Sequence, residues 1–278
     1  MKKKTLPAYK LLVHRGLCAN ADYAKRWIMA GKVIVNDRRI DKAGEQVPEN
    51  ADVRIKGMSR YVGKGGFKLE GALSNFGVTV SGKIALDAGA STGGFTDCLL
   101  QHGASRVYAV DVGFGNLAGK LRSDARVVNL EKTNISDLGI EALDPPPSLA
   151  TVDLSYLSLQ KAIPIVSRLL APDGQLLCLV KPLFETPDAE IRRQGMIADP
   201  AIFKEILETL SRFVQDEHLN LLGVTHSPIR GNNGTVEFWL WISKDATASV
   251  ITAIQLDRTI ESALALPDWD KERDGLNS

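Results

Sequence analysis

The stretch Lys83-Ile-Ala-Leu-Asp-Ala-Gly-Ala-Ser-Thr-Gly-Gly-Phe-Thr-Asp-Cys-Leu-Leu100 joins a short apolar run to a glycine-rich turn and an amphipathic segment. Residues 84–86 predict a buried strand, because a continuous apolar run is typical of a strand covered on both faces. Gly89, Gly93 and Gly94 allow the backbone to turn sharply and to approach a ligand closely. The stretch therefore predicts a strand, a turn and a helix whose N-terminal N–H groups face a ligand.

A second apolar run, residues 106–110, ends in Asp111. Nucleotide-binding folds place an acid about 20 residues after the glycine-rich loop, where it binds ribose hydroxyls. The predicted ligand therefore carries a ribose. The loop has the spacing acid-x-G-x-x-x-G from Asp87 through Gly89 to Gly93 rather than G-x-G-x-x-G. This spacing resembles the loop of S-adenosylmethionine-dependent methyltransferases.

The loop also fits two other interpretations. Residues 89–93 also satisfy G-x-S-x-G, the nucleophile elbow of hydrolases, with Asp153 and His226 following in hydrolase order. An elbow serine normally follows several strands and an HGGG-like segment, whereas this loop follows the first strand of its domain. Alternatively, the glycines only shape a turn in a non-catalytic domain.

The composition is typical of a soluble globular protein. The chain has 278 residues, 44% hydrophobic and 24% charged, enough for one large and one small domain. No apolar run approaches the ~18 residues of a membrane span, and no secretory signal follows Met1. Three distant cysteines and four histidines lack disulfide or metal-ligand spacing. We therefore expect a cytoplasmic protein with no metal and no membrane partner.

Charge divides the chain into two parts. Residues 1–60 contain 14 Lys/Arg and 6 Asp/Glu, a net charge of +8, whereas the other 218 residues carry −7. A basic module beside a near-neutral to acidic body indicates that the first part meets a polyanion and that the second carries the chemistry. A solvated basic surface is the alternative.

The basic module is predicted to form two helices and then hairpin strands. Helical patterns cover Leu6–Arg15 and the segment that Asn20 caps, and residues 33–35 and 53–55 are strand-like, separated by turn-rich residues 36–39. The stretch LLVHRGLCANADYAKRWIMAGKVIVNDRRI resembles the S4 RNA-binding domain. That resemblance implies phosphate contacts from six basic residues: Arg15, Lys25, Arg26, Lys32, Arg38 and Arg39.

Three later apolar runs each bring an ionisable residue. Asp153 and Lys181 end predicted strands, and Glu237 lies inside the last one. Ligands gather at the carboxyl ends of parallel strands. Together with Lys68, on a helix predicted from residue 65, these residues resemble the Lys-Asp-Lys-Glu tetrad of FtsJ-type ribose 2′-O-methyltransferases. A salt-bridge network is the alternative for each residue alone.

Six blocks in order extend the resemblance to the TlyA family, which joins an S4 domain to an FtsJ-like methyltransferase domain. They are SRYVGKGGFKLEGAL, LDAGASTGGFTDCLL, VDVGFGNLAGKLR, VDLSYLSLQKAIP, VKPLFE and SPIRGNNGTVEFWLW. The family implies an α/β, Rossmann-like methyltransferase fold with a mostly parallel seven-stranded sheet, preceded by a small α+β S4 domain. We expect an S4-like domain at 1–60, a methyltransferase domain at 61–246 and a C-terminal helical extension at 247–278.

The resemblance implies transfer of a methyl group from S-adenosyl-L-methionine to a ribose 2′-OH of ribosomal RNA, with cytidine as the target and rRNA or ribosomal subunits as partners. The implied catalytic residues are Lys68, Asp153, Lys181 and Glu237. Lys181 is assigned to deprotonate or hydrogen-bond the 2′-OH. The expected cofactor contacts are Asp87, Gly89, Ser91, Thr92, Gly93, Gly94, Asp111, Asn134 and Asp153.

The sequence leaves two competing functions open. One is a non-catalytic, RNA-binding ribosome-assembly factor, which the intact tetrad disfavours. The other is a membrane-active haemolysin, a label attached to the family, which the absence of an apolar span disfavours. Residues 182–200 are expected to form a loop over the site, Asp199 to cap a following helix, and residues 249–266 to have helical spacing.

Overall fold

The computed structural model describes residues 4–15, 17, 18, 20–57, 59–155, 157–244 and 253–267. The chain divides into two compact units, Met1–Arg60 and Tyr61–Ser278. Parts of the predicted C-terminal extension, residues 247–252 and 268–278, lie outside the described residues. Among the described residues, none of the helices combines the length and the apolar character that a membrane crossing requires.

The small unit packs two helices against short strands. Its elements are β1 (Thr5–Pro7), α1 (Ala8–His14), α2 (Ala21–Met29), β2 (Val33–Val35), β3 (Arg38–Ile40), β4 (Gln46–Pro48) and β5 (Val53–Ile55). The strands form a β1-β4 pair and a sheet of order β3-β2-β5. Buried Leu11, Leu12 and Ile28 join the helices to the strands in one core. The Asn20 side chain caps α2 by accepting a hydrogen bond from Tyr23 N, 2.9 Å away, as its position predicted.

Two expectations for this unit were wrong in detail. The first helix begins at Ala8, because residues 5–7 pair with β4 instead. The predicted turn at 36–39 is shorter than expected. Asn36 and Asp37 both have positive φ, which closes a two-residue hairpin. Arg38 and Arg39 consequently lie in strand β3 and pair with β2.

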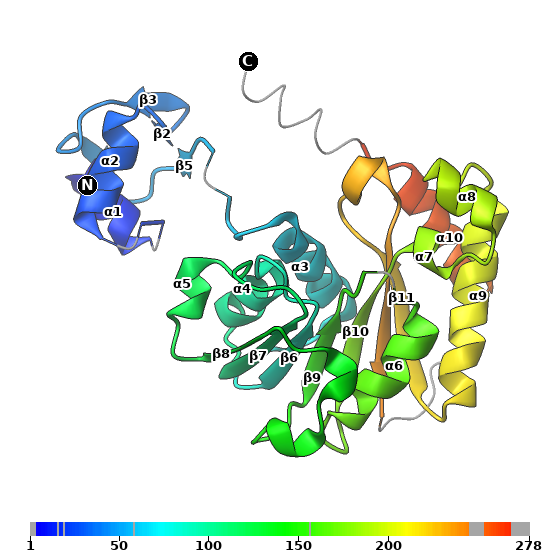
Figure 1. The fold of residues 1–278 in the computed structure, drawn as a ribbon. Coiled ribbons are helices and arrows are strands. Elements are labelled where there is room, and N and C mark those ends of the chain that lie inside the picture. The colour runs from blue at the N-terminus through cyan, green and yellow to red at the C-terminus, as the bar shows by residue number, and fades with distance from the viewer. Residues whose placement is uncertain are drawn as a thin grey trace. The chain divides into compact units, whose positions relative to one another are not determined.

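The large unit is built on a seven-stranded sheet of order β11-β12-β10-β9-β6-β7-β8 (Figure 1). Its strands are β6 (Ile84–Ala88), β7 (Arg106–Asp111), β8 (Val127–Glu131), β9 (Leu149–Val152), β10 (Gln175–Val180), β11 (Asn220–His226) and β12 (Phe238–Ser243). Strand β12 runs antiparallel to both of its neighbours, β10 and β11, whereas the other strand pairs of this sheet are parallel. The mostly parallel Rossmann-like sheet predicted from the sequence is confirmed.

Helices cover both faces of this sheet. One layer contains α3 (Lys64–Phe76), α4 (Gly94–Gln101) and α5 (Gly119–Arg122); the other contains α6 (Leu159–Arg168), α9 (Pro200–Asp216) and α10 (Ala253–Leu264). Short helices α7 (Pro182–Glu185) and α8 (Ala189–Gln194) and the 3₁₀ turns η1 (Ile135–Asp137), η2 (Ile140–Ala142) and η3 (Asn232–Gly234) complete the unit. Successive side chains of β12 point to opposite faces of the sheet. Phe238 packs in the layer of α6, α9 and α10, and Trp239 packs in the layer of α3, α4 and α5.

The segment expected as a loop over residues 182–200 instead forms the short helices α7 and α8. Asp188 begins α8 by accepting hydrogen bonds from Glu190 N and Ile191 N. Asp199 accepts a hydrogen bond from Ala201 N at 2.9 Å and caps α9, as predicted. Helix α10 packs on β11 and α9 with Leu256, Ile260 and Ala263 buried in the large unit's core.

Candidate active site

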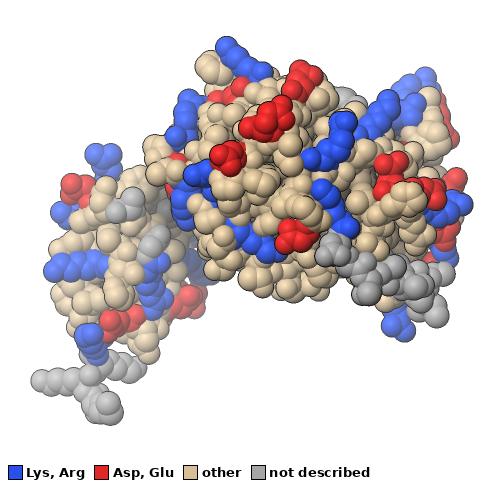
Figure 2. All heavy atoms as spheres, turned by 90° about the horizontal axis from the view of Figure 1, so that it is seen from below, with Lys and Arg blue, Asp and Glu red and all other residues tan. Residues whose placement is uncertain are grey.

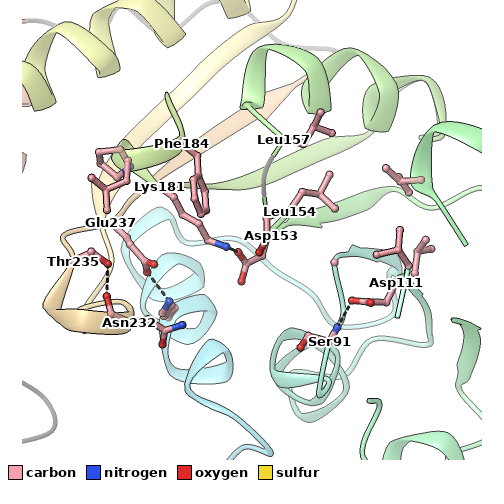
Figure 3. Close-up of a pocket in the computed structure, with 18 of the residues that line it drawn as sticks. Ser91, Asp111, Asp153, Leu154, Leu157, Lys181, Phe184, Asn232, Thr235 and Glu237 are labelled. Atoms are coloured by element: carbon pink, nitrogen blue, oxygen red, sulfur yellow. Dashed lines mark hydrogen bonds and ion pairs between the residues drawn. The ribbon is translucent and has the colours of Figure 1, made fainter. Parts of the chain in front are cut away.

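A pocket of about 850 Å³ opens at the edge of the sheet where strands β6, β7, β9 and β10 end. Figure 3 shows its side chains arriving from these strand ends, from α3 and from the turn before β12. The parallel strands point the same way, so the residues that follow them converge at one edge. Gly89, Asp111, Asp153 and Lys181 line the pocket for this reason.

The four tetrad residues all line this pocket and form two ion pairs. Lys68 Nζ lies 2.6 Å from Glu237 Oε2, and these side chains are 11% and 5% exposed. Lys181 Nζ pairs with Asp153 Oδ1, and these side chains are 20% and 24% exposed. The structure therefore contains one buried pair and a second pair that is open to a ligand (Figure 3).

Glu237 does not lie inside the last strand, as the sequence suggested, but directly before it. Because β12 runs antiparallel, its first residue, Phe238, pairs with Val180, the last residue of β10. Glu237 therefore lies at the same sheet edge as Lys181. Burial raises the pKa of the Glu237 carboxyl, and the neighbouring Lys68 ammonium opposes that rise.

The packing of α3 on α4 positions Lys68. Helix α3 begins at Lys64, and the glycine pair Gly65-Gly66 follows in its first turn. A Cβ on Gly94 of α4 would lie 3.1 Å from Gly66 N and 3.2 Å from Gly65 Cα. A side chain at Gly94 would require these backbones to separate by a few tenths of an ångström, so glycine favours their close approach. Lys68, one turn farther along α3, is thereby brought to the pocket and to Glu237.

The glycine-rich turn contacts the second ion pair through its backbone. Gly89 has a φ of +92°, and a Cβ there would lie 2.5 Å from the carbonyl oxygen of Asp153. Farther along the same turn, Ser91 N donates a hydrogen bond to Asp111 Oδ2 at 2.7 Å. Gly113 N donates to Asp111 Oδ1, also at 2.7 Å. The Asp111 carboxylate is thus held in one orientation at the pocket wall.

Five of the expected cofactor contacts line the pocket: Gly89, Ser91, Asp111, Asn134 and Asp153. Among these, Asn134 also begins η1 by accepting a hydrogen bond from Ser136 N at 3.2 Å. The other four, Asp87, Thr92, Gly93 and Gly94, do not line it. A Cβ on Gly93 would lie 2.2 Å from Leu121 Cδ1, so this glycine fits the turn against α5.

Asp87 lies beneath the turn and is fully buried. It accepts hydrogen bonds from Thr96 Oγ1 at 2.6 Å and from Thr151 Oγ1 at 3.1 Å. Burial raises the pKa of the Asp87 carboxyl to about 6, although both hydroxyls oppose that rise. The acid of the motif therefore ties α4 and β9 to β6 in this structure.

Sequence reasoning did not select several pocket residues, including Phe184, Asn232 and Asn233. Their segments were within matched sequence blocks, but no local pattern distinguishes them from ordinary turn residues. Phe184 lies near Lys181, whose Nζ is 5.8 Å from the centre of its ring. Thr235 Oγ1 donates a hydrogen bond to Asn232 O at 3.0 Å and shapes the turn beside Glu237.

The hydrolase alternative requires His226 to act with Ser91 and Asp153. Ser91 and Asp153 line the pocket, whereas His226 does not. The His226 ring lies at the end of β11, where Nδ1 is 2.8 Å from Ser227 O. The three side chains therefore do not form a triad. Among the described residues, no group of three or more His, Cys, Asp or Glu side chains could hold a metal ion.

In the small unit, the six expected RNA contacts differ in how their charges are engaged. Arg38 pairs with Glu45, Arg39 with Asp41 and Lys25 with Asp22. Arg15 Nη2 donates to Glu49 O at 2.6 Å. The remaining two, Arg26 and Lys32, are exposed and have no hydrogen-bond or ion-pair partner among the described side chains. Figure 2 shows that Lys and Arg lie close to Asp and Glu on the visible surface.

Both units of the chain resemble known protein families. The family of FtsJ-like methyltransferases matches residues 61–244, and the S4 domain matches residues 10–53. The protein YqxC of Bacillus subtilis is 41% identical over 258 residues, covering 91% of this chain and 92% of that protein. The 16S/23S rRNA (cytidine-2′-O)-methyltransferase TlyA of Mycobacterium tuberculosis is 36% identical over 256 residues, covering 91% and 95%.

A solved structure from Streptococcus thermophilus, a hemolysin by name, is also similar. It is 35% identical, has a TM-score of 0.71, and covers 98% of this chain and 99% of its own. The two family matches follow the order of the two units. The chain therefore belongs to the FtsJ-like methyltransferase family, in the TlyA group that joins this domain to an S4 domain.

Proposed function

We propose that the protein transfers a methyl group from S-adenosyl-L-methionine to the 2′-hydroxyl of a cytidine in ribosomal RNA. The observation that carries the proposal is the convergence of two lysine–carboxylate pairs with the glycine-rich turn in one pocket. Family membership supports methyl transfer, and the TlyA relative supports the rRNA cytidine substrate. Such a substrate would place the protein in the cytoplasm, with the ribosome.

The pocket residues fit the proposed cofactor. The carboxylate of Asp111, oriented by Ser91 N and Gly113 N, has the chemistry to accept hydrogen bonds from ribose hydroxyls. At Gly89 the backbone faces the Asp153 carbonyl so closely that no side chain fits. Asn134 adds an amide to the same wall. Bound S-adenosyl-L-methionine would supply a methyl group already activated by its sulfonium.

The ion pairs suggest how this chain assists the acceptor. A ribose hydroxyl is a weak nucleophile and must lose its proton as it attacks. We assign Lys181 Nζ to the 2′-oxygen, because its pair with Asp153 is the exposed one. Lys68, held by Glu237 at 2.6 Å, adds a fixed positive charge in a buried setting. Such a charge would stabilise the developing alkoxide.

The remaining rate enhancement is proposed to come from positioning of the two substrates. Methyl transfer requires oxygen, carbon and sulfur to lie on one line, and residues held by packing and ion pairs keep that geometry. In the small unit, exposed Arg26 and Lys32 are the proposed RNA phosphate contacts that need not break an existing ion pair. The other four expected contacts are proposed to exchange their present partners for phosphates.

Transfer of labelled methyl from S-adenosyl-L-methionine to rRNA or subunits from an unmodified strain tests the proposal. Wild type is compared with Lys181→Ala and with Lys161→Ala, which removes an exposed lysine outside the pocket. We expect 2′-O-methylcytidine from wild type and Lys161→Ala but not from Lys181→Ala. Binding of the cofactor and RNA by wild type without any transfer would instead favour a ribosome-assembly factor.

A further inference from the structure

Arg230 connects backbone carbonyls of two segments that are far apart in the sequence. Its Nη1 donates to Gly234 O at 3.1 Å, Nη2 to Leu264 O at 2.9 Å and Nε to Leu266 O at 3.0 Å. Leu264 is the last residue of α10, Leu266 lies two residues beyond it, and Gly234 is the last residue of η3. One guanidinium therefore ties the C-terminal helix to the turn that lines the pocket.

The chemistry of these bonds favours a fixed geometry. The last carbonyls of a helix have no partner within the helix and carry partial negative charge. An arginine supplies several donors in one rigid plane, so a single side chain satisfies carbonyls on two segments. Helix α10 is itself held in the core by Leu256, Ile260 and Ala263. The anchor for the turn is therefore a packed helix.

The turn in question contacts the tetrad. A Cβ on Gly231 would lie 2.3 Å from Glu237 Oε1 and 2.6 Å from Thr235 Oγ1. The backbone next to Arg230 thus lies directly against the Glu237 carboxylate. Gly231 N also donates a hydrogen bond to Thr235 O at 2.8 Å, which closes the turn. A shift at residues 230 and 231 would consequently displace Glu237 and its partner Lys68.

We propose that Arg230 is a positioning residue for methyl transfer, which fixes the turn at residues 231–235, and through it Glu237 and Lys68, to the end of α10. The inference rests on the proposed function and assigns a purpose to the C-terminal helix. In this role Arg230 does not itself contact the substrate. The walls formed by Ser91 and Asp111 belong to other strand ends, so cofactor affinity is expected to be independent of Arg230.

The test compares Arg230→Ala and Arg230→Lys with wild type in the full chain. We expect Arg230→Ala to lower kcat by about ten-fold or more, with the Kd for S-adenosyl-L-methionine within about two-fold of wild type. Arg230→Lys should be intermediate, because one ammonium cannot reproduce the planar set of donors. A proportionate rise in cofactor Kd, or an unchanged kcat, would overturn the proposal.

Lys204→Ala is the matched control. Lys204 Nζ lies 2.9 Å from Asp257 Oδ1 and joins α9 to α10 at the surface, away from the turn. Removing this pair perturbs α10 without touching Arg230, so kcat should stay within about two-fold of wild type. An equal loss of kcat in Lys204→Ala would mean that general docking of α10 matters, and the specific role of Arg230 would be wrong.

Hydrogen exchange gives a readout that does not depend on activity. The amides of Gly231 and Thr235 donate hydrogen bonds inside the turn and should exchange faster in Arg230→Ala and Arg230→Lys, but not in Lys204→Ala. Unchanged exchange at these amides would refute the positioning role even if wild type methylated no RNA. Faster exchange together with an inactive wild type would refute only the proposed reaction.

Discussion

Lys68 and Glu237 form an ion pair inside the large unit, with Nζ and Oε2 2.6 Å apart and both side chains at most 11% exposed. The second ion pair of the pocket, between Lys181 and Asp153, is more exposed. A buried pair stabilises a fold little relative to apolar residues, but loss of one partner leaves the other charge without compensation. Loss of one partner should therefore lower the free energy of unfolding more for the Lys68–Glu237 pair than for the Lys181–Asp153 pair.

Glu237→Ala should therefore destabilise the protein by about 3 kcal/mol and abolish methyl transfer. The double variant Lys68→Met/Glu237→Leu removes both charges and should recover most of that stability without recovering activity. Urea unfolding of the variants measures the first effect, and labelled methyl transfer the second. A double variant no more stable than Glu237→Ala would show that the buried charge is not the cause.

Gly89→Ala should destabilise the protein by about 2 kcal/mol or more and weaken methyl transfer. The new Cβ would lie 2.5 Å from Asp153 O, and the φ of +92° is strained for alanine. Gly119→Ala is the control, because nothing lies within 4 Å of its Cβ and its φ is not positive. Thermal unfolding should show a loss only for Gly89→Ala; similar curves for both variants would contradict the close approach.

Asp111→Asn should weaken S-adenosyl-L-methionine binding by about ten-fold or more. Both carboxylate oxygens accept backbone N–H groups, from Ser91 and Gly113. An asparagine would turn its NH₂ toward one of these donors, and an unsatisfied donor costs about 1–3 kcal/mol. Calorimetric titration measures the change. The exposed Asp137→Asn, on η1 outside the pocket, should bind normally.

Glu185 predicts a pH dependence of stability. Its Oε1 accepts a hydrogen bond from Leu159 N at 2.9 Å, and burial raises the pKa of its carboxyl from 4.5 to about 7. The folded state therefore holds this proton more tightly than the unfolded state. Its contribution is fully present below about pH 4.5 and is lost as the pH rises through about 7.

Glu185→Gln keeps an oxygen for Leu159 N but cannot ionise. Relative to this variant, wild type should lose about 1–2 kcal/mol between pH 5 and pH 8, a figure reduced for the partial exposure of the side chain. The loss corresponds to a few degrees in Tm. Thermal unfolding at both pH values provides the comparison. A constant difference between the two proteins would show that Glu185 does not titrate in this window.

Arg26→Ala and Lys32→Ala should each weaken RNA binding and lower the slope of log K against log salt by about 0.7–0.9. Both charges are exposed and lack partners among the described residues. Arg38→Ala should have a smaller effect, because its guanidinium is already paired with Glu45. Binding to rRNA measured across a salt series distinguishes the three. Equal slopes for wild type and all variants would exclude these residues from the interface.

Much of the fold is determined by local sequence. The apolar run at residues 84–86 and the glycines that follow it produce β6, its turn and α4, as the stretch predicts. Asn20 and Asp199 cap their helices because capping depends only on neighbouring backbone N–H groups. The tetrad and the acid at 111 also came from local patterns and the family resemblance. The domain boundaries and the roles of site residues stay predictions.

The tertiary structure alone decided which strands and helices become neighbours. Glu237 lies at the same sheet edge as Lys181 because β12 runs antiparallel, a direction that its apolar run does not specify. Asp87 lies under the turn because Thr96 and Thr151, far apart in sequence, enclose its carboxylate. Arg230 meets the end of α10 across 34–36 residues. Local sequence sets dihedral angles and caps, whereas contacts between distant segments exist only once the chain has packed.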